Sequence, residues 1–240
     1  MTKLDTTRFF FHRQPVHVLA GLLIAGIAWF SIDGEALSGE ALGISTQAWL
    51  VTGFAIGMAH QVYVWVLWRG ELCWSIVTRQ LGSERGFLLY RIVFFILLIS
   101  RLVPAFTVAY TDFGSWYTPN YLTNMVALLI FLPVGYTLFC VLKYFGFSRA
   151  SGADHFDPEY RTKPFVRKGV FKYIPNAMYT LAFLLFFVFA VATGSKAMLA
   201  LAAFYYVFIW VHYFCTERPD MEVIYGGHLE QIRVGIDGKA

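Results

Sequence analysis

The chain has 240 residues, a formal net charge of +4, 58% hydrophobic residues and only 14% charged residues. So large an apolar fraction excludes an ordinary soluble domain, and the length leaves room for several membrane spans but for no second globular domain. The basic residues lie mostly in short loops, so they indicate membrane orientation and contact with anionic headgroups, and no nucleic-acid binding is expected.

Residues 1–14 combine basic residues with the run Phe9-Phe10-Phe11, which is typical of an anchor at the membrane interface. A cleaved signal peptide is not expected, because Pro15 and His17 lead into a longer apolar stretch and not toward a small-residue cleavage site. Four apolar stretches then predict four transmembrane helices, at residues 16–32, 48–68, 87–109 and 122–145.

Two more apolar runs, residues 177–193 and 197–215, are separated only by Gly194-Ser195-Lys196. Each run is close to the roughly 20 residues that a helix needs to cross a membrane. They predict a helical hairpin whose two polar ends return to the same membrane face. The expected fold is an all-α integral membrane protein with about six transmembrane helices, divided into residues 1–145, a four-helix region, and residues 146–240.

The distribution of charge predicts the orientation of these helices. Residues 69–86 and 146–176 are rich in Lys and Arg, whereas residues 33–45 and 110–121 contain neither. Since basic loops stay on the cytoplasmic side, both termini are expected there.

Several polar residues interrupt the apolar stretches. Arg91 is expected to reach the inner membrane interface with its long side chain, and Arg101 to do the same at the outer interface. Three others, His60, Gln61 and Asn124, are interpreted as hydrogen-bond partners between helices. The cysteines Cys73, Cys140 and Cys215 form no ligand spacing, and no cluster of His, Asp or Glu calls for a metal.

The two ends of the predicted hairpin carry complementary chemistry. Asn176 is a strong helix cap after Pro175, so the fifth helix should begin at Ala177 and leave the first backbone amides, residues 177–179, free to bind an anion near Lys172. At the other end, Glu217 follows directly on an apolar run, and a carboxylate there favours a cationic ligand. Taken singly, each end also fits an ordinary membrane-interface anchor.

The same residues carry a resemblance to a known family. The sequences Asn176-Ala177-Met178-Tyr179 and Glu217-Arg218-Pro219 with Tyr225, preceded by the glycine-bearing stretch 146–152, resemble the phosphatidylethanolamine N-methyltransferases and their relatives, the isoprenylcysteine carboxyl methyltransferases. The family motifs read roughly Asn-Pro-Met-Tyr and Glu-Glu-Pro, so Ala177 and Arg218 depart from them. The Arg-His-Pro motif of the carboxyl methyltransferases is absent, which favours the phospholipid branch.

The resemblance implies a membrane methyltransferase that uses S-adenosylmethionine, releases S-adenosylhomocysteine and N-methylates an aminophospholipid such as phosphatidylethanolamine. The lipid would reach the site sideways from the bilayer, and the site would face the cytoplasm of a bacterial inner membrane or an ER-type membrane. Residues 146–240 would then be the catalytic region, and the first four spans would set substrate choice. The implied cofactor-binding residues are Gly152, Lys172, Tyr173, Asn176, Met178, Tyr179, Glu217 and Arg218. Candidates for the base that deprotonates the amine are Asp154, His155, Glu159 and His212.

The sequence leaves three different functions open as well. The chain could be an isoprenylcysteine-type carboxyl methyltransferase or another small-substrate membrane methyltransferase. It could be an NADPH-dependent membrane enzyme of the steroid-reductase kind, to which the acidic closing motif is a poorer match. It could also be a non-catalytic membrane protein whose polar helix ends are interface anchors.

Overall fold

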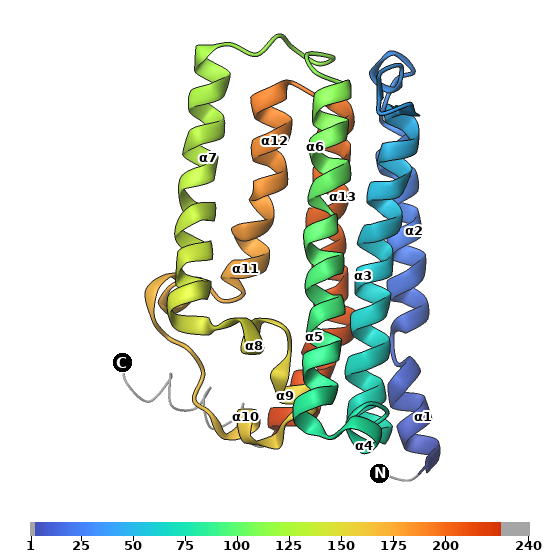
Figure 1. Ribbon diagram of the computed structural model, residues 1–240, viewed down its shortest axis with the longest axis vertical. Coiled ribbons are helices and arrows are strands. Elements are labelled where there is room, and N and C mark those ends of the chain that lie inside the picture. Colours follow the sequence, from blue (N-terminus) through green and yellow to red (C-terminus); the bar gives the residue numbers. More distant parts are fainter. Residues whose placement is uncertain (1–2, 227–240) are drawn as a thin grey trace.

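The computed structural model describes residues 3–226, and helices form nearly all of it (Figure 1). Five helical segments are long and apolar enough to cross a membrane, namely Thr6–Phe30, Thr46–Trp74, Ser83–Thr111, Tyr121–Phe145 and Lys196–Gly226. The predicted all-α membrane fold is therefore confirmed. The end of the predicted C-terminal region, residues 227–240, lies outside the described residues.

The fifth predicted span has the predicted bounds but is shorter than the other five. It is a shorter apolar helix, Ala177–Thr193, composed of α11 (Ala177–Thr180), a 3₁₀ turn and α12 (Leu185–Thr193). It is shorter than the roughly 20 residues of a full span and packs between α7 (Tyr121–Cys140) and α13 (Lys196–His212) (Figure 1). The described residues thus contain five long apolar helices and one shorter apolar helix, at the six places where the sequence predicts spans.

The remaining elements connect these spans. Two spans are divided in the structure, the first into α1 (Lys3–Phe11) and α2 (Gln14–Phe30), the third into α5 (Ser83–Ser100) and α6 (Leu102–Thr111). Two π-helical turns, Val141–Phe145 and Tyr213–Glu217, extend α7 and α13. The short elements are α4 (Thr78–Leu81), α8 (Phe147–Ala150), α9 (Ala153–Phe156), α10 (Pro158–Thr162), the 3₁₀ turns Glu35–Leu37, Gly169–Lys172 and Ala182–Leu184, and the antiparallel strands β1 (Glu40–Ala41) and β2 (Ile44–Ser45).

The second span is longer than predicted. The helix α3 (Thr46–Trp74) begins where the Ser45 hydroxyl accepts a hydrogen bond from the Ala48 amide, and it ends at Ser75 in a left-handed conformation. The prediction that Arg69 opens a polar loop is wrong, because α3 continues past it for more than a turn. Beyond Arg69 the helix contacts the N-terminal segment, where the ring centres of Trp74 and Phe10 lie 5.0 Å apart.

The core of the bundle forms around α13. Fully buried side chains of α13, among them Leu201, Phe204 and Tyr205, pack against α2, α3 and α12. Gly57 of α3 permits this approach, since an added Cβ would lie 2.8 Å from the rings of Phe204 and Tyr205. The outward faces of α2, α5 and α7 carry exposed apolar side chains such as Leu22, as lipid-facing helices do.

Polar contacts lock the turn of the C-terminal hairpin. The carboxylate of Asp112 accepts hydrogen bonds from the Ser195 hydroxyl at 2.6 Å and from the Ala197 amide at 2.8 Å. Lys196 forms an ion pair with Asp33, and the pKa of Asp33 is lowered by the hydrogen bond from Lys196. The hairpin is thereby anchored at this end, and α11 begins in the lower half of the bundle, short of its far end (Figure 1).

The two arginines of the third span differ in their surroundings. Arg91 donates a hydrogen bond to the Ser148 hydroxyl at 2.9 Å. Arg101 is only 1% exposed, donates to the Gly57 carbonyl at 3.4 Å and lies 5.3 Å from the centre of the Tyr205 ring. The prediction that Arg101 reaches the outer interface is therefore wrong, since the helices around it bury the guanidinium inside the bundle.

Candidate functional site

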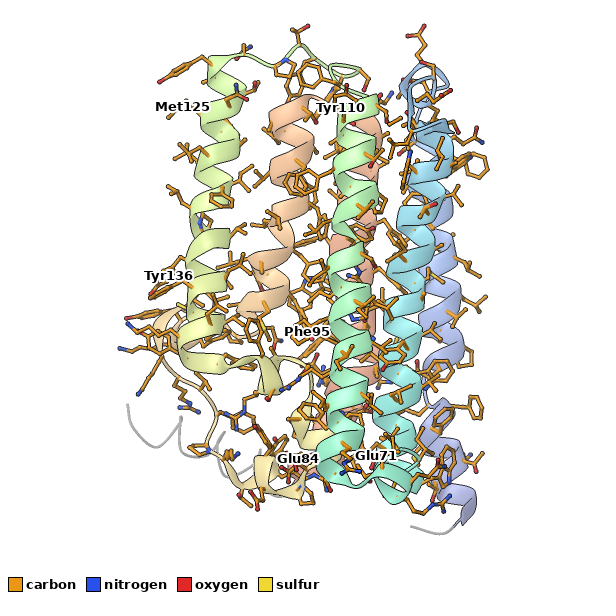
Figure 2. The ribbon with its side chains drawn as sticks, viewed as in Figure 1. Glu71, Glu84, Phe95, Tyr110, Met125 and Tyr136 are labelled. Atoms are coloured by element: carbon orange, nitrogen blue, oxygen red, sulfur yellow. The ribbon has the colours of Figure 1, made fainter. Side chains whose placement is uncertain are left out.

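A cavity of about 320 Å³ lies inside the bundle, between α3, α5, α7 and the C-terminal hairpin. Its wall is mostly apolar and aromatic, and Phe95 projects from the side of α5 that faces α8 and α11 (Figure 2). Polar side chains enter the wall at only a few positions, including His60, Tyr179 and His212. A largely apolar cavity with few polar groups is the usual form of a small-molecule site.

The cavity has a closed end and an open rim. His60 and His212 line it with exposures of 3% and 2%. By contrast, the lining residues Ile99, Leu138 and Phe147 are 59%, 42% and 53% exposed. Because Ile99 and Leu138 lie on spans, the rim opens sideways toward the region that lipid occupies.

The two polar ends of the hairpin meet beside this cavity. Met178 and Tyr179 of α11 line the wall, and the Tyr179 hydroxyl donates a hydrogen bond to the Glu217 carboxylate. Glu217 is the last residue of the π-helical turn that follows α13. Such turns often mark functional sites, because the extra residue re-aims the side chains of the helix. The segments that carry the two sequence motifs are thus in direct contact.

The start of the short helix departs from the expected cap. The helix begins at Ala177 as predicted, but Asn176 has a left-handed φ of 54° and its side chain makes no capping hydrogen bond. Instead, the Asn176 carbonyl accepts hydrogen bonds from the amides of Tyr179 at 2.8 Å and Thr180 at 3.0 Å. The predicted side-chain cap is wrong, and the Tyr179 amide already has a partner.

Of the eight predicted cofactor-binding residues only Met178 and Tyr179 line the cavity, and three of the other six have exposed side chains. Lys172 is exposed and its ammonium lies 5.2 Å from the ring centre of Tyr173, which is 75% exposed. Arg218 is exposed as well and pairs with Glu222 at 3.4 Å. Contacts between these side chains and a cofactor remain predictions.

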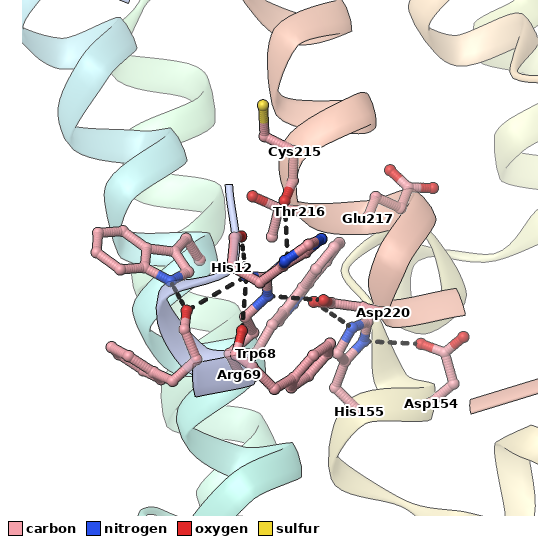
Figure 3. A network of polar contacts seen from close by, with 12 residues as sticks. His12, Trp68, Arg69, Asp154, His155, Cys215, Thr216, Glu217 and Asp220 are labelled. Atoms are coloured by element: carbon pink, nitrogen blue, oxygen red, sulfur yellow. Dashed lines mark hydrogen bonds and ion pairs between the residues drawn. The ribbon is translucent and has the colours of Figure 1, made fainter. Parts of the chain in front are cut away.

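A buried network of charged side chains lies next to the cavity (Figure 3). Arg69 donates to Asp220 at 2.8 Å, and neither side chain is accessible to solvent. His155 pairs with Asp220 at 3.5 Å and with Asp154 at 3.1 Å. The Tyr225 hydroxyl donates to the second oxygen of Asp154 at 2.9 Å. The network joins α3, α9 and the end of the last span, Lys196–Gly226.

Arg69 also holds the N-terminal segment. Its guanidinium donates to the backbone carbonyls of Phe9 at 3.0 Å and His12 at 2.6 Å, and to the Cys215 carbonyl at 2.8 Å. Sequence reasoning did not assign this role, because it placed Arg69 in a loop. The apolar residues that follow Arg69 were the available signal that the helix continues.

The protonation of the network follows from its geometry. Burial by itself lowers the pKa of His155, but the carboxylates of Asp154 and Asp220 outweigh it and raise the pKa to about 9. Burial raises the pKa of Asp154, and the contact with His155 more than reverses this, so the pKa lies below its ordinary value. At neutral pH the network therefore holds an imidazolium between two carboxylates.

Folding stability is expected to depend on the charge of His155. Because its pKa rises from 6.5 to about 9 on folding, the stabilisation is complete below pH 6.5 and disappears as the pH rises to about 9. The thermal unfolding midpoint in detergent, measured from pH 6 to pH 10, should fall across this window. In the variant His155→Asn the midpoint should not fall across this pH window. If it falls as steeply as in the unaltered protein, the charge of His155 is not the cause of the pH dependence.

Gly152 packs its backbone against the Trp68 ring, which lines the cavity and stacks on His155 at 4.1 Å. Gly152 has a φ of 80°, and an added Cβ would lie 2.4 Å from the ring of Trp68. Only glycine adopts this conformation easily and allows so close an approach.

The variant Gly152→Ala is therefore expected to lose about 1–2 kcal/mol from backbone strain and a further ~1–3 kcal/mol from overpacking. Gly43→Ala is the control, because Gly43 in the turn between β1 and β2 also has a left-handed φ, 73°, but nothing within 4 Å of an added Cβ. The control should lose only the strain contribution, as measured by thermal unfolding in detergent. Equal losses in both variants would show that the contact with Trp68 is not tight.

The four candidate bases occupy different surroundings. Asp154 and His155 belong to the buried network, whereas Glu159 of α10 is exposed. His212 lines the cavity, and its ring centre lies 5.9 Å from that of Trp68. Within residues 3–226 no group of three or more His, Cys, Asp or Glu side chains could hold a metal ion.

The sequence was also compared with known proteins. Residues 122–228 match the family model described as phospholipid methyltransferase. No curated protein and no solved structure matches the chain. The matched region begins in α7 and includes the cavity-lining helix α11, Glu217 and most of the buried network. The resemblance in the sequence motifs is confirmed, since the C-terminal part of this membrane protein, residues 122–228, matches the phospholipid methyltransferase family.

Proposed function

We propose that the protein transfers a methyl group from S-adenosylmethionine to the amine of a membrane aminophospholipid such as phosphatidylethanolamine. The observation that carries this proposal is the contact between Tyr179 and Glu217, which joins the two family motifs beside a cavity open to the lipid. The family match over residues 122–228 supports a methyltransferase in general terms. The cofactor and the acceptor are the proposed parts.

The residues beside the cavity suit the cofactor. Glu217 is a carboxylate at the edge of an apolar space, where its attraction for a cationic centre is weakly screened. When bound, S-adenosylmethionine supplies a methyl group on a positively charged sulfur, and Glu217, Tyr179 and Met178 would hold it. The predicted contacts through Gly152, Lys172, Tyr173, Asn176 and Arg218 belong to the same proposal.

The cavity wall would orient the two reactants and exclude water, and orientation supplies most of the rate in such a reaction. The acceptor lipid would pass through the rim at Ile99, Leu138 and Phe147 with its headgroup inside the cavity. By the distribution of basic loops, this end of the bundle would face the cytoplasm. An ammonium headgroup must lose a proton before its nitrogen can attack, so a base is required. Of the candidates Asp154, His155, Glu159 and His212, it is His212 that lines the cavity.

The test is to incubate the detergent-solubilised protein with labelled S-adenosylmethionine and a total lipid extract, and to identify the lipid that gains mass. The expected product is an N-methylated aminophospholipid. Label found only in a prenylated cysteine carboxylate would favour the isoprenylcysteine-type reaction. A protein that labels no acceptor in extracts supplemented with both substrate types would contradict the proposal.

Calorimetric titration distinguishes a methyltransferase from a reductase and from a non-catalytic membrane protein. The proposal expects binding of S-adenosylhomocysteine and no binding of NADPH. Binding of NADPH alone would favour the steroid-reductase kind of enzyme, and binding of neither compound would favour a non-catalytic membrane protein.

A further inference from the structure

Two histidines at the closed end of the cavity lack hydrogen-bond partners. Among the described residues, both ring nitrogens of His60 and the Nδ1 of His212 have no partner, although both side chains line the cavity. The expectation that His60 bonds to a neighbouring helix is therefore wrong. A buried polar group without a partner costs about 1–3 kcal/mol. Unpaired nitrogens on one cavity wall indicate that a ligand supplies their partners.

Aromatic neighbours hold the two imidazole rings in place. The ring of His60 meets that of Phe94 edge to face at 4.7 Å, and His212 lies beside Trp68 at 5.9 Å. Both aromatic residues line the cavity as well. These contacts fix the rings without using their nitrogens, so the nitrogens remain available to a molecule inside the cavity.

The rest of the wall restricts what that molecule can be. Within the described residues no Asp or Glu lines the cavity, and the nearby carboxylate of Glu217 is bonded to Tyr179 and assigned to the cofactor, so the histidine part of the wall is left to a neutral group. Unpaired imidazole nitrogens are well suited to hydrogen bonds with a neutral amine, which both donates and accepts. Met178 and Tyr179 form another part of the wall. An amine held by the histidines would therefore share the cavity with the family motif.

Building on the proposed function, we propose that His60 and His212 form the acceptor site, where they bind the amine of the lipid headgroup and take the proton that it releases. An N–H bond of the headgroup breaks and the proton passes to an imidazole nitrogen. The nitrogen lone pair forms a bond to the methyl carbon of the sulfonium donor, and the electron pair of the broken C–S bond stays on sulfur. The imidazole returns its proton to solvent after the product leaves.

His17 provides a matched control. It is 0% exposed, its Nε2 has no partner among the described residues, and its ring lies 5.3 Å from that of His212. It does not line the cavity. The variants His60→Gln, His212→Gln and His17→Gln therefore place the same change inside and outside the proposed site.

The first measurement is calorimetric binding of short-chain phosphatidylethanolamine to the full chain in detergent. Loss of one hydrogen bond to a buried partner is expected to weaken binding about 5- to 100-fold in His60→Gln and His212→Gln. Binding should be unchanged in His17→Gln, and the affinity for S-adenosylhomocysteine should be unchanged in all three. Equal lipid affinities in the three variants, or no binding of the lipid to the unaltered protein, would overturn the proposal.

The second measurement tests the proton transfer. The variant His60→Ala is expected to lose methyl transfer about 100-fold or more, in line with the usual contribution of a general base, and added imidazole should restore part of the rate. A variant that loses S-adenosylhomocysteine affinity in parallel would place the histidines in the cofactor site and overturn the assignment. If the unaltered protein binds the lipid but transfers no methyl group, the proposed function is wrong. The lipid affinities of the three His→Gln variants would still show whether His60 and His212 bind the headgroup.

Discussion

Replacing Glu217 with glutamine is expected to weaken binding of S-adenosylmethionine, whose sulfur carries the positive charge, about 10- to 100-fold. The change keeps the size of the side chain and removes its charge, and a hydrogen bond to a charged group is worth about 1.5–3 kcal/mol. Glu217 lies at the junction of the two motif segments, where the Tyr179 hydroxyl orients its carboxylate. Calorimetric titration of the purified protein in detergent measures the effect.

Two control variants separate the role of the charge from that of the contact. Glu84→Gln removes an exposed carboxylate from the first turn of α5, away from the two motifs, and it should leave the affinity unchanged. Tyr179→Phe removes the hydroxyl but keeps the Glu217 carboxylate, so its loss should be smaller than that of Glu217→Gln. An affinity in Glu217→Gln equal to that of the unaltered protein would assign Glu217 to a membrane-interface anchor.

The C-terminal hairpin could be predicted because its determinants are local in sequence. Two apolar runs separated by Gly194-Ser195-Lys196 bring their polar ends back together, and the contact between Tyr179 and Glu217 follows from that return. The family match over residues 122–228 covers the same stretch. Local periodicity and motif order were sufficient here, because neighbouring helices of a hairpin pack against each other.

The buried charges could not be predicted, because their partners lie far away in the chain. Arg69 and Asp220 are separated by 151 positions, and nothing near Arg69 in the sequence indicates its carboxylate partner. Arg101 is surrounded by groups from other helices, including the Gly57 carbonyl and the Tyr205 ring. The cavity presents the same difficulty, since α3, α5, α7 and α13 all contribute to its wall.

Replacing Asp220 with alanine is expected to destabilise the protein by about 3–5 kcal/mol, because it leaves the guanidinium of Arg69 buried without its carboxylate. Both side chains of this pair have no solvent exposure, so water cannot take the place of the missing partner. Asp220 also faces His155, which loses one of its two carboxylates in the same variant. Thermal unfolding in detergent should show a midpoint well below that of the unaltered protein.

Two further variants serve as controls for the stability loss measured in Asp220→Ala. Glu222→Ala breaks the exposed pair with Arg218 and should cost only ~0–1 kcal/mol. In the double variant Arg69→Met with Asp220→Leu no charge of the pair is left alone, so it should be more stable than Asp220→Ala although it lacks both charges. If Asp220→Ala costs no more than Glu222→Ala, the pair does not hold the helices together. If the double variant is as unstable as the single one, the carbonyl contacts that Arg69 makes to Phe9, His12 and Cys215 matter more than its charge partner.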